Sequence, residues 1–402
     1  MSLLDLLDRE ETWEAFARYR ASLALPKKEA ADLARFIREK QYRTVCRSIE
    51  AGEPFPLPRK AVISKMSASK KRVVYIYPEP ENTFLKGLTH LLLRTYDGLF
   101  TEDLYSFRPG RTAQKAVRRL IRTEGVGSWY AYKADIHDYF NSIPVGRLLP
   151  LLRDALRGDP ELYAFLSGLL TESRVLERGK VTEERKGIMA GTPLSAFYAN
   201  LYLSGLDEWV RGQNVPYARY SDDMILFAPS KEETERYAGL LKERLAACGL
   251  EMNPAKERLY APEEGFVFLG FEVRGNRVDI APATCDKLKG KMRRKRDALQ
   301  RWKKRGGYTG EQAASAFIRV FNRKLLENAQ DNDLTWSNWF FAVINTTDRL
   351  HEIDLYAQDC IRFLISGTHT KARFNARYED LKRLGYRSLV HAYYAYSKKE
   401  ND

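Results

Sequence analysis

Two adjacent carboxylates, Asp222 and Asp223, are the first residues of this sequence whose types and spacing could do chemistry. They follow Ser221 in a short polar stretch between two β-prone runs, 217–220 and 224–227, so the pattern predicts a hairpin with both carboxylates at its tip. Like charges side by side repel, and here they adjoin strands that should be buried. A neutralising cation is therefore expected, a divalent metal being the simplest; a solvated Asp-Asp turn is the alternative.

A third carboxylate, Asp135, stands at the end of another strand-like run, 129–136. Taken alone, an aspartate there is typical of a strand cap or turn. Three hard oxygen donors from two neighbouring strands, however, can hold two Mg²⁺ ions about 4 Å apart, with Mn²⁺ as the alternative ion. Such an arrangement activates a 3′-hydroxyl and stabilises a leaving pyrophosphate, so the pattern indicates nucleotidyl transfer.

The charge balance favours a polyanionic partner. The chain has 402 residues and a formal net charge of +14, and its 44% hydrophobic content is that of a folded protein with two or three domains. Its four cysteines are too far apart for a zinc site or a disulfide framework, which fits a reducing cytoplasm. We read no signal peptide and no run of membrane-spanning length, so a membrane partner is not expected.

Several predicted elements surround the carboxylates. Apolar residues at helical spacing predict helices up to about residue 49, with a break at Pro26. Strands at 61–66 and 72–77 form a hairpin whose basic turn, with Lys65 and Arg72, could close over a triphosphate; a solvated basic turn is the alternative. Further helices are expected at 82–98, 112–123, 196–212 and 231–248, and a strand pair at 265–273.

Two loops and one helix add candidate anion sites. Arg108 and Arg111 flank a Pro-Gly break that feeds a helix, where a phosphate backbone could dock. The small-residue loop 187–195, which includes Gly191, would let a nucleotide approach the backbone closely, although ordinary helix-start chemistry also explains it. The basic run 287–305 is either a solvated helix face or a helix that grips a duplex backbone, with nucleic-acid contacts at Arg293, Arg294, Arg296 and Trp302.

Five sequence blocks follow one another along the chain. The blocks are Tyr105-Ser106-Phe107-Arg108-Pro109-Gly110-Arg111, Asp135-Ile136-His137-Asp138-Tyr139-Phe140, Gly191-Thr192-Pro193-Leu194-Ser195 with Ala199-Asn200-Leu201-Tyr202-Leu203, Tyr220-Ser221-Asp222-Asp223, and Phe268-Leu269-Gly270-Phe271. Each block is weak alone, but the ordered set is highly specific. It resembles the bacterial reverse transcriptases, the family of group II intron, retron, diversity-generating and phage-defence enzymes, and the resemblance runs from about residue 71 to 273.

The resemblance implies roles for individual residues. Asp135, Asp222 and Asp223 match the catalytic carboxylates, with the Ile136 carbonyl as a further metal ligand. Phe140 falls where the family excludes a 2′-hydroxyl. The stretch 268–271, with Leu269 and Gly270, looks like the primer grip. The residues matched to nucleotide binding are Lys65, Arg72, Ile136, His137, Asp138, Tyr139, Phe140, Gly191 and Lys256.

The implied fold is α+β, a right-hand polymerase with fingers, an antiparallel palm sheet packed on helices, and a helical C-terminal thumb. We expect a helical N-terminal extension (1–58), fingers (59–134), a palm (135–280, with finger insertions at about 145–186) and a basic thumb and C-terminal region (281–402). One departure is Ala190, where the family usually has a glutamine that contacts the nucleotide. This residue puts fidelity and strict template dependence in question.

These features predict an RNA-directed DNA polymerase that uses Mg²⁺ and dNTPs and makes cDNA on a dedicated noncoding RNA in bacterial anti-phage defence. Two alternatives stay open: a template-independent DNA polymerase of abortive-infection type, and a non-catalytic RNA-binding or splicing cofactor. A scaffold protein would not need all three carboxylates, and all three are present. The template, the primer and the oligomeric state are left open by the sequence.

Overall fold

A computed structural model of the chain describes residues 2–23, 25–64, 71–185, 187–327 and 336–401. Its internal contacts divide the chain into two compact units, Met1–Ala261 and Pro262–Asp402. Each unit is described by itself. The strand pair at 265–273, which the sequence grouped with the preceding domain, falls in the second unit by this division.

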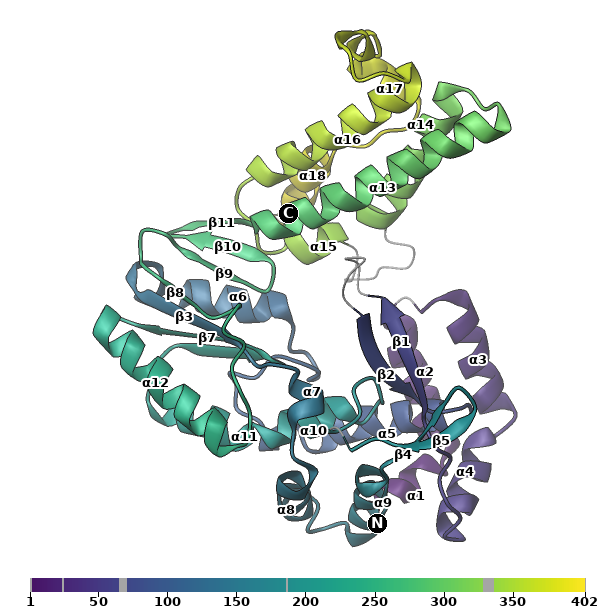
Figure 1. Cartoon of the computed structure of the whole chain (residues 1–402), viewed down its shortest axis with the longest axis vertical. Coiled ribbons are helices and arrows are strands. Elements are labelled where there is room, and N and C mark those ends of the chain that lie inside the picture. The colour runs from purple at the N-terminus through teal and green to yellow at the C-terminus, as the bar shows by residue number, and fades with distance from the viewer. Residues whose placement is uncertain (1, 24, 65–70, 186, 328–335, 402) are drawn as a thin grey trace. The chain divides into compact units, whose positions relative to one another are not determined.

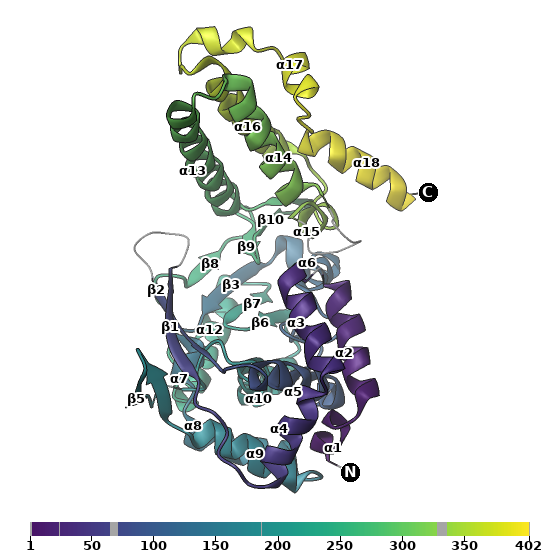
Figure 2. The same ribbon diagram turned by 90° about the vertical axis from the view of Figure 1, so that its right-hand side faces the viewer.

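The first unit begins with four helices, as the apolar spacing predicted. Trp13 is fully buried among them and packs against the rings of Phe36 and Tyr42. A Cβ at Gly87 of the next helix would lie 2.5 Å from the Trp13 ring, so only glycine fits this close approach. Figure 2 shows α2 and α3 lying beside each other, in agreement with their contacts. The four helices are α1 (Leu3–Leu7), α2 (Glu10–Ser22), α3 (Lys27–Arg38) and α4 (Gln41–Glu50), and the next helix is α5 (Glu81–Thr95).

A four-stranded sheet with the order β2-β1-β4-β5 follows the N-terminal helices. The predicted hairpin is confirmed: β1 (Arg59–Ser64) and β2 (Lys71–Ile76) pair antiparallel, with Ile63 opposite Arg72. The other two strands, β4 (Arg174–Glu177) and β5 (Lys180–Glu183), also pair antiparallel, and β1 meets β4 in parallel at Arg59 and Leu176.

A second four-stranded sheet, fully antiparallel with the order β6-β7-β3-β8, carries the candidate site. Its strands are β3 (Tyr130–Asp135), β6 (Tyr217–Tyr220), β7 (Asp223–Ala228) and β8 (Arg258–Tyr260). The central strand β7 is buried almost throughout because α12 (Lys231–Ala247) packs against both β3 and β7, as Figure 1 shows. The sheet is thereby a rigid platform for whatever its strand ends carry.

Shorter helices connect these sheets. The helix expected at 196–212 is divided into two at Leu203. Asp159 caps α9 by accepting from the Leu162 N–H, and its other oxygen accepts from the Leu3 N–H at 2.8 Å, which ties α9 to the start of α1. The helices are α6 (Ala113–Arg122), α7 (Tyr139–Ser142), α8 (Val145–Ala155), α9 (Pro160–Thr171), α10 (Ser195–Tyr202) and α11 (Ser204–Gly212), with 3₁₀ turns at Asp97–Leu99 and Val126–Ser128.

The second unit joins a three-stranded antiparallel sheet, order β11-β10-β9, to a set of helices. Asp354, buried in α16, accepts hydrogen bonds from Tyr386, Ser388 and the first N–H groups of α18, so one carboxylate organises the C-terminal segment. In Figure 2, α13, α14 and α16 lie side by side, as their contacts require. The elements are β9 (Phe266–Phe268), β10 (Phe271–Arg274), β11 (Arg277–Ile280), α13 (Pro282–Gly306), α14 (Gly310–Leu325), α15 (Trp336–Phe341), α16 (Asp348–Ser366), a 3₁₀ turn (Lys371–Asn375), α17 (Tyr378–Arg383) and α18 (Leu389–Asn401).

The architecture is thus α+β, with mostly antiparallel sheets packed on helices. Within the described ranges, none of the helices is both long and apolar enough to cross a bilayer.

Candidate active site

The three carboxylates predicted to act together lie at one edge of the central sheet. Asp135 ends β3 and Asp223 begins β7, and the two residues are directly paired across the strands. The carbonyl of Asp222 accepts from the Ile136 N–H at 3.1 Å, which fastens the turn to the end of β3. We call Asp135, Asp222 and Asp223 the strand-end carboxylates.

Their charges are close enough to perturb one another. The pKa of Asp222 is raised to about 6, first by burial and then by the negative charges of Asp135 and Asp223. Lysines partly neutralise the set: Lys256 Nζ donates to Asp135 Oδ2 at 2.6 Å, and Lys133 Nζ lies 3.5 Å from Asp223 Oδ1. The sequence had matched Lys256 to the nucleotide and had missed Lys133.

Arg219 supports the backbone turn at Ser221, and the sequence-based interpretation did not identify this residue. Its guanidinium is fully buried, donates two hydrogen bonds to the fully buried Asp207 of α11, and donates a third to the Ser221 carbonyl at 3.2 Å. Ser221 has a positive φ of 61°, so this contact supports a backbone conformation that few residues adopt. Burial lowers the pKa of Arg219, but the charge and hydrogen bonding of Asp207, together with Tyr139 and Tyr217, outweigh this effect and raise the pKa.

A signal for this pair was present in the sequence. Arg219 interrupts an otherwise apolar strand, and Asp207 stands between Leu206 and Val210 on the buried face of a helix. Buried charges of opposite sign require each other, so the two could have been paired by elimination. The loop before α6 joins the same support, because the Arg219 N–H donates to the Asp103 carbonyl and its own carbonyl accepts from the Tyr105 N–H.

The residues after Asp135 divide into exposed and buried positions. His137 and Asp138 are exposed, whereas Phe140 is half-buried beside Tyr139. Tyr139 is buried in the core, and its hydroxyl donates to the Ala199 carbonyl at 2.5 Å. Tyr139 was predicted to bind nucleotide; its side chain instead secures α7 to α10, since burial leaves it no face for a ligand.

The loop before α10 packs against the hairpin. Gly191 has φ of +99°, and a Cβ there would lie 2.9 Å from the Val74 side chain of β2. The Ala190 carbonyl accepts from the Tyr75 N–H at 3.0 Å, and the Ala190 side chain is buried. The position of this loop is therefore coupled to that of β2. The side chain of Ala190 is buried and does not extend toward a nucleotide.

Two residues that were predicted to contact a triphosphate, Lys65 and Arg72, lie wholly or partly outside the described residues. Lys65 lies outside the described residues. Arg72 belongs to β2 by its backbone, but its side chain also lies outside what the structure describes. Their contact with a triphosphate stays a prediction.

Arg108 has a structural role in place of the predicted nucleic-acid contact. All five of its N–H donors point at internal acceptors: the Asp97 carboxylate and carbonyl, and the carbonyls of Thr101 and Leu104. A buried guanidinium with no donor left cannot bind a phosphate. Arg111 is half-buried and donates to the Glu102 carbonyl, so it keeps donors for a ligand, and its predicted role stays untested.

In the second unit, Leu269 and Gly270 form the tight turn between β9 and β10, both with positive φ. Arg293 and Arg294 are exposed on α13, and Trp302 is 38% exposed and stacks on Tyr308 at 3.8 Å between ring centroids. Arg296 differs, because its guanidinium contacts Asp297 and the Phe363 ring within the unit. These contacts use only part of the Arg296 guanidinium's donors, so the nucleic-acid contacts of Arg296 and of the other three residues stay predictions.

The strand-end carboxylates fit a hard divalent cation by the chemistry of their donors, since carboxylate oxygens are what Mg²⁺ prefers. In the described part of the chain, no group of three or more His, Cys, Asp or Glu side chains is arranged to hold a metal ion as it stands. At this edge, Lys256 and Lys133 form ion pairs with Asp135 and Asp223.

Comparison with known proteins identifies a family to which the sequence is similar. A family model described as "Reverse transcriptase (RNA-dependent DNA polymerase)" matches residues 63–273. The group II intron-encoded protein LtrA of Lactococcus lactis is 23% identical over 257 residues, which is 63% of this chain and 40% of LtrA. An uncharacterized 91 kDa protein in a cob intron of Schizosaccharomyces pombe is 28% identical over 158 residues, 38% of this chain and 18% of that protein. The chain thus spans less than half the length of these relatives.

Among solved structures, a telomerase from Candida albicans in complex with a fragment of telomeric RNA matches with a TM-score of 0.46 and 12% identity, over 89% of this chain and 71% of that one. A telomerase from Candida tropicalis in complex with the same kind of fragment matches with a TM-score of 0.47 and 11% identity, over 82% and 64%.

Proposed function

The chain belongs to the reverse transcriptase (RNA-dependent DNA polymerase) family, and we propose that it synthesises DNA on an RNA template by nucleotidyl transfer. One observation carries the proposal. Asp135 and Asp223 are paired across β3 and β7, and the backbone carbonyl of the adjacent Asp222 accepts a hydrogen bond from the Ile136 N–H. Nothing in the packing of the sheet requires three carboxylates at this edge, and their mutual repulsion has a cost that a catalytic use explains.

Asp135, Asp222 and Asp223, with the Ile136 carbonyl, are the residues that would hold two Mg²⁺ ions. When bound, such ions would lower the pKa of the primer hydroxyl and neutralise charge on the leaving pyrophosphate. The chain's own contribution is position: β3, β7 and the Arg219 contact to the Ser221 carbonyl fix where the carboxylates stand. Lys256, which is 54% exposed, has the length and freedom to leave Asp135 for a nucleotide phosphate.

We assign the remaining parts by the same proposal. The sheet that carries the strand-end carboxylates is the palm, the β1-β2 hairpin with Lys65 and Arg72 belongs to the fingers, and the helices from α13 onward form the thumb. Phe140 discriminates against a 2′-hydroxyl, and the β9-β10 turn is the primer grip. The ligands are an RNA template, dNTPs and the cDNA product. The proposal does not include an oligomeric state.

We further propose a dedicated noncoding RNA as the template, in cytoplasmic anti-phage defence. The support is the resemblance of the C-terminal third to that of defence-associated reverse transcriptases and the basic α13 with exposed Arg293 and Arg294. Sequencing the nucleic acid that copurifies with the chain, before and after dNTPs are added, identifies the template.

The test of the polymerase proposal is the double variant Asp222→Ala/Asp223→Ala. Incorporation of dNTPs on a primed RNA template should fall roughly a thousandfold or more, because several kcal/mol of transition-state stabilisation is removed. RNA binding should stay within about twofold, since the basic surface is unchanged. The control is Glu208→Ala/Glu243→Ala, which removes two exposed carboxylates elsewhere in the same unit.

Two outcomes would redirect the proposal. Full activity in the Asp222/Asp223 variant would remove the strand-end carboxylates from catalysis. Equal incorporation by the wild type with and without the RNA template would favour untemplated synthesis, for which the buried Ala190 is the supporting feature. No incorporation with any template would favour the RNA-binding cofactor.

A further inference from the structure

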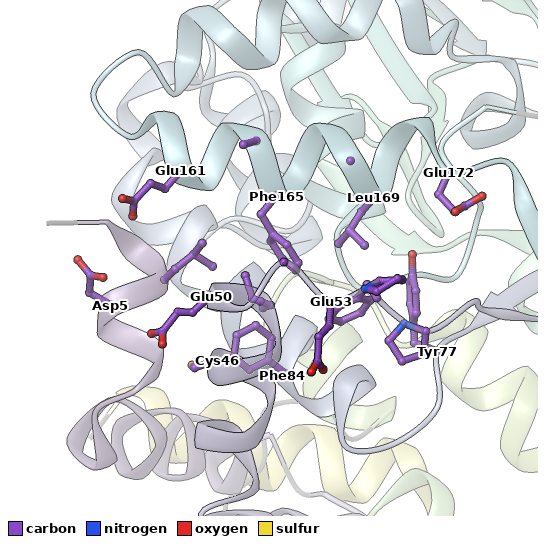
Figure 3. Close-up of a pocket in the computed structure, with 18 residues that line it drawn as sticks. Asp5, Cys46, Glu50, Glu53, Tyr77, Phe84, Glu161, Phe165, Leu169 and Glu172 are labelled. Carbon is purple, nitrogen blue, oxygen red and sulfur yellow. The ribbon is translucent and has the colours of Figure 1, made fainter.

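A cavity of about 720 Å³ lies in the first unit, away from the strand-end carboxylates. Its walls are α1, α4, α9 and the segment 52–56, together with Tyr77 and Phe84. Figure 3 shows the side chains that line it. The volume is in the range that small organic ligands occupy in proteins.

Aromatic and aliphatic side chains form its floor. Phe55 packs edge-on against Tyr77 at 5.6 Å and against Phe165 at 5.4 Å between ring centroids. Ile49 and Leu169 complete the apolar surface. Such a floor would contact the hydrocarbon part of a ligand and, through ring faces, a cation.

The rim of the cavity is negatively charged, whereas the chain as a whole is positively charged. Five carboxylates line the cavity, and no lysine, arginine or histidine is among its described lining residues, although the chain has a net charge of +14. Glu172 is paired with Arg174 at 2.7 Å, whereas the other four make no ion pair within the described ranges. We call these five the pocket carboxylates: Asp5, Glu50, Glu53, Glu161 and Glu172.

Two residues of the cavity wall, Cys46 and Tyr77, show the electrostatic and polar character of its interior. The pKa of the Cys46 thiol is raised to about 12 by burial and by the charges of Asp8, Glu50 and Asp5, so the cavity wall stands in a negative field. Tyr77 is only 6% exposed and lines the cavity, yet its hydroxyl makes no hydrogen bond with another described residue. The hydroxyl oxygen is not one of the fully buried atoms that lack a partner, so it is open to a ligand or to water.

The carboxylates are grouped at two sides. In Figure 3, Asp5, Glu50 and Glu161 lie to the left of Phe165, and Glu53 and Glu172 lie to its right, with Glu172 toward Tyr77. This spacing does not suit a single metal ion, and no group of three or more acidic, His or Cys side chains in the described chain is arranged to hold one. A nucleic-acid backbone has the same sign of charge as the rim and would be repelled.

We propose that this cavity binds a linear aliphatic amine with ammonium groups at both ends, a diamine or polyamine. The ammonium groups pair with carboxylates at the two sides, one of them also donating to the Tyr77 hydroxyl, and the methylene chain lies on Phe55 and Phe165. The proposal is independent of the polymerase activity, because none of its residues belongs to the strand-end set.

Isothermal titration of the full chain, freed of nucleic acid by nuclease and high salt, tests this proposal with spermidine and 1,8-diaminooctane. Saturable binding of one molecule per chain is expected, and octylamine, with one charge, should bind at least about tenfold weaker. The variant Glu50→Gln/Glu53→Gln, with one substitution on each side, should weaken both amines at least about tenfold. The two residues are exposed, and Glu50 stands at the C-terminal end of α4, where a negative charge does not help the helix, so the variant should fold.

The matched control is Glu208→Gln/Glu243→Gln, which makes the same charge change at exposed positions outside the cavity and should bind both amines within about twofold of wild type. A second variant, Phe165→Leu, should weaken 1,8-diaminooctane while the melting temperature verifies folding. No saturable binding at millimolar amine, equal affinities in the two Gln pairs, or equal binding of octylamine and 1,8-diaminooctane would each overturn the proposal.

Discussion

The strand-end carboxylates and the pocket carboxylates concentrate negative charge in one basic chain by different means. The first set is fixed by backbone pairing between β3 and β7, is supported by the buried Arg219, and contacts two lysines. The second set projects from separate helices and loops around an aromatic floor, and among the described residues its one basic partner is Arg174, which contacts Glu172. Similar charge is therefore placed on a rigid scaffold in one case and on an open rim in the other.

The difference separates two kinds of cation. A metal ion needs several oxygens within a few ångströms of one point, which strands supply because their registers fix adjacent residues. An extended organic cation needs charges at a distance and apolar surface between them, which helices around a cavity supply. Removing supports from the two sets should consequently have unequal effects.

The largest difference is expected when the arginine partner of each region is removed. Arg219→Leu leaves Asp207 buried without its partner and should lower the free energy of unfolding by about 3–5 kcal/mol. Arg174→Leu removes a guanidinium that is 58% exposed from Glu172 and should cost less than about 1 kcal/mol. Urea unfolding of both variants measures the two values.

A compensated variant distinguishes stability from positioning. Arg219→Met/Asp207→Leu replaces the buried pair by apolar side chains and should recover most of the lost stability. Polymerase activity should stay at least about tenfold below wild type, since the hydrogen bond to the Ser221 carbonyl is still missing. Recovery of both stability and activity would show that Arg219 only fills the core.

The sequence predicted much of the frame of the site. The hairpin around Asp222, the strand end at Asp135 and the helix 231–248 follow from period and turn chemistry, and the structure confirms them as β6, β7, β3 and α12. These signals are local. Each depends on residues within a few positions of one another, which is why the sequence contains them.

What the sequence did not show depends on contacts between distant positions. Arg108 was predicted to face a ligand, but its acceptors at 97–104 become visible only when the loop folds back. The cavity joins residues from Leu4 to Glu172, and no pattern along the chain brings them together. The pair of Arg219 and Asp207 could be predicted only in part. A charged residue inside an apolar strand indicates that a partner exists, but it does not identify that partner.

A smaller effect is expected from pH in metal-free buffer. The folded protein raises the pKa of Asp222 from 3.8 to about 6, so folding penalises its charged form. Stability from this residue is therefore present below pH 4 and falls as the pH rises toward 6, by at most about 3 kcal/mol. Asp222→Asn should consequently be more stable than wild type at pH 7 and equal to it at pH 4.

Chemical unfolding in EDTA at several pH values measures this difference. Glu50→Gln in the exposed rim should differ from wild type by less than about 0.5 kcal/mol over the same range. If Asp222→Asn and Glu50→Gln showed the same pH profile, the contrast between a coupled and an open set of carboxylates would be lost.

The smallest effect should come from making the strand-end set resemble the pocket by removing a lysine. Lys256→Met frees Asp135 Oδ2, and because Lys256 is 54% exposed, the metal-free protein should lose no more than about 1 kcal/mol. The carboxylates then lack one of their own cations, so Mg²⁺ should raise the melting temperature of Lys256→Met more than that of wild type. Lys133→Met, which removes a 3.5 Å contact to Asp223, should change the Mg²⁺ response in the same direction but less. A Mg²⁺ response that is weaker in Lys256→Met than in wild type would mean that the lysine assists the metal instead of standing in for it.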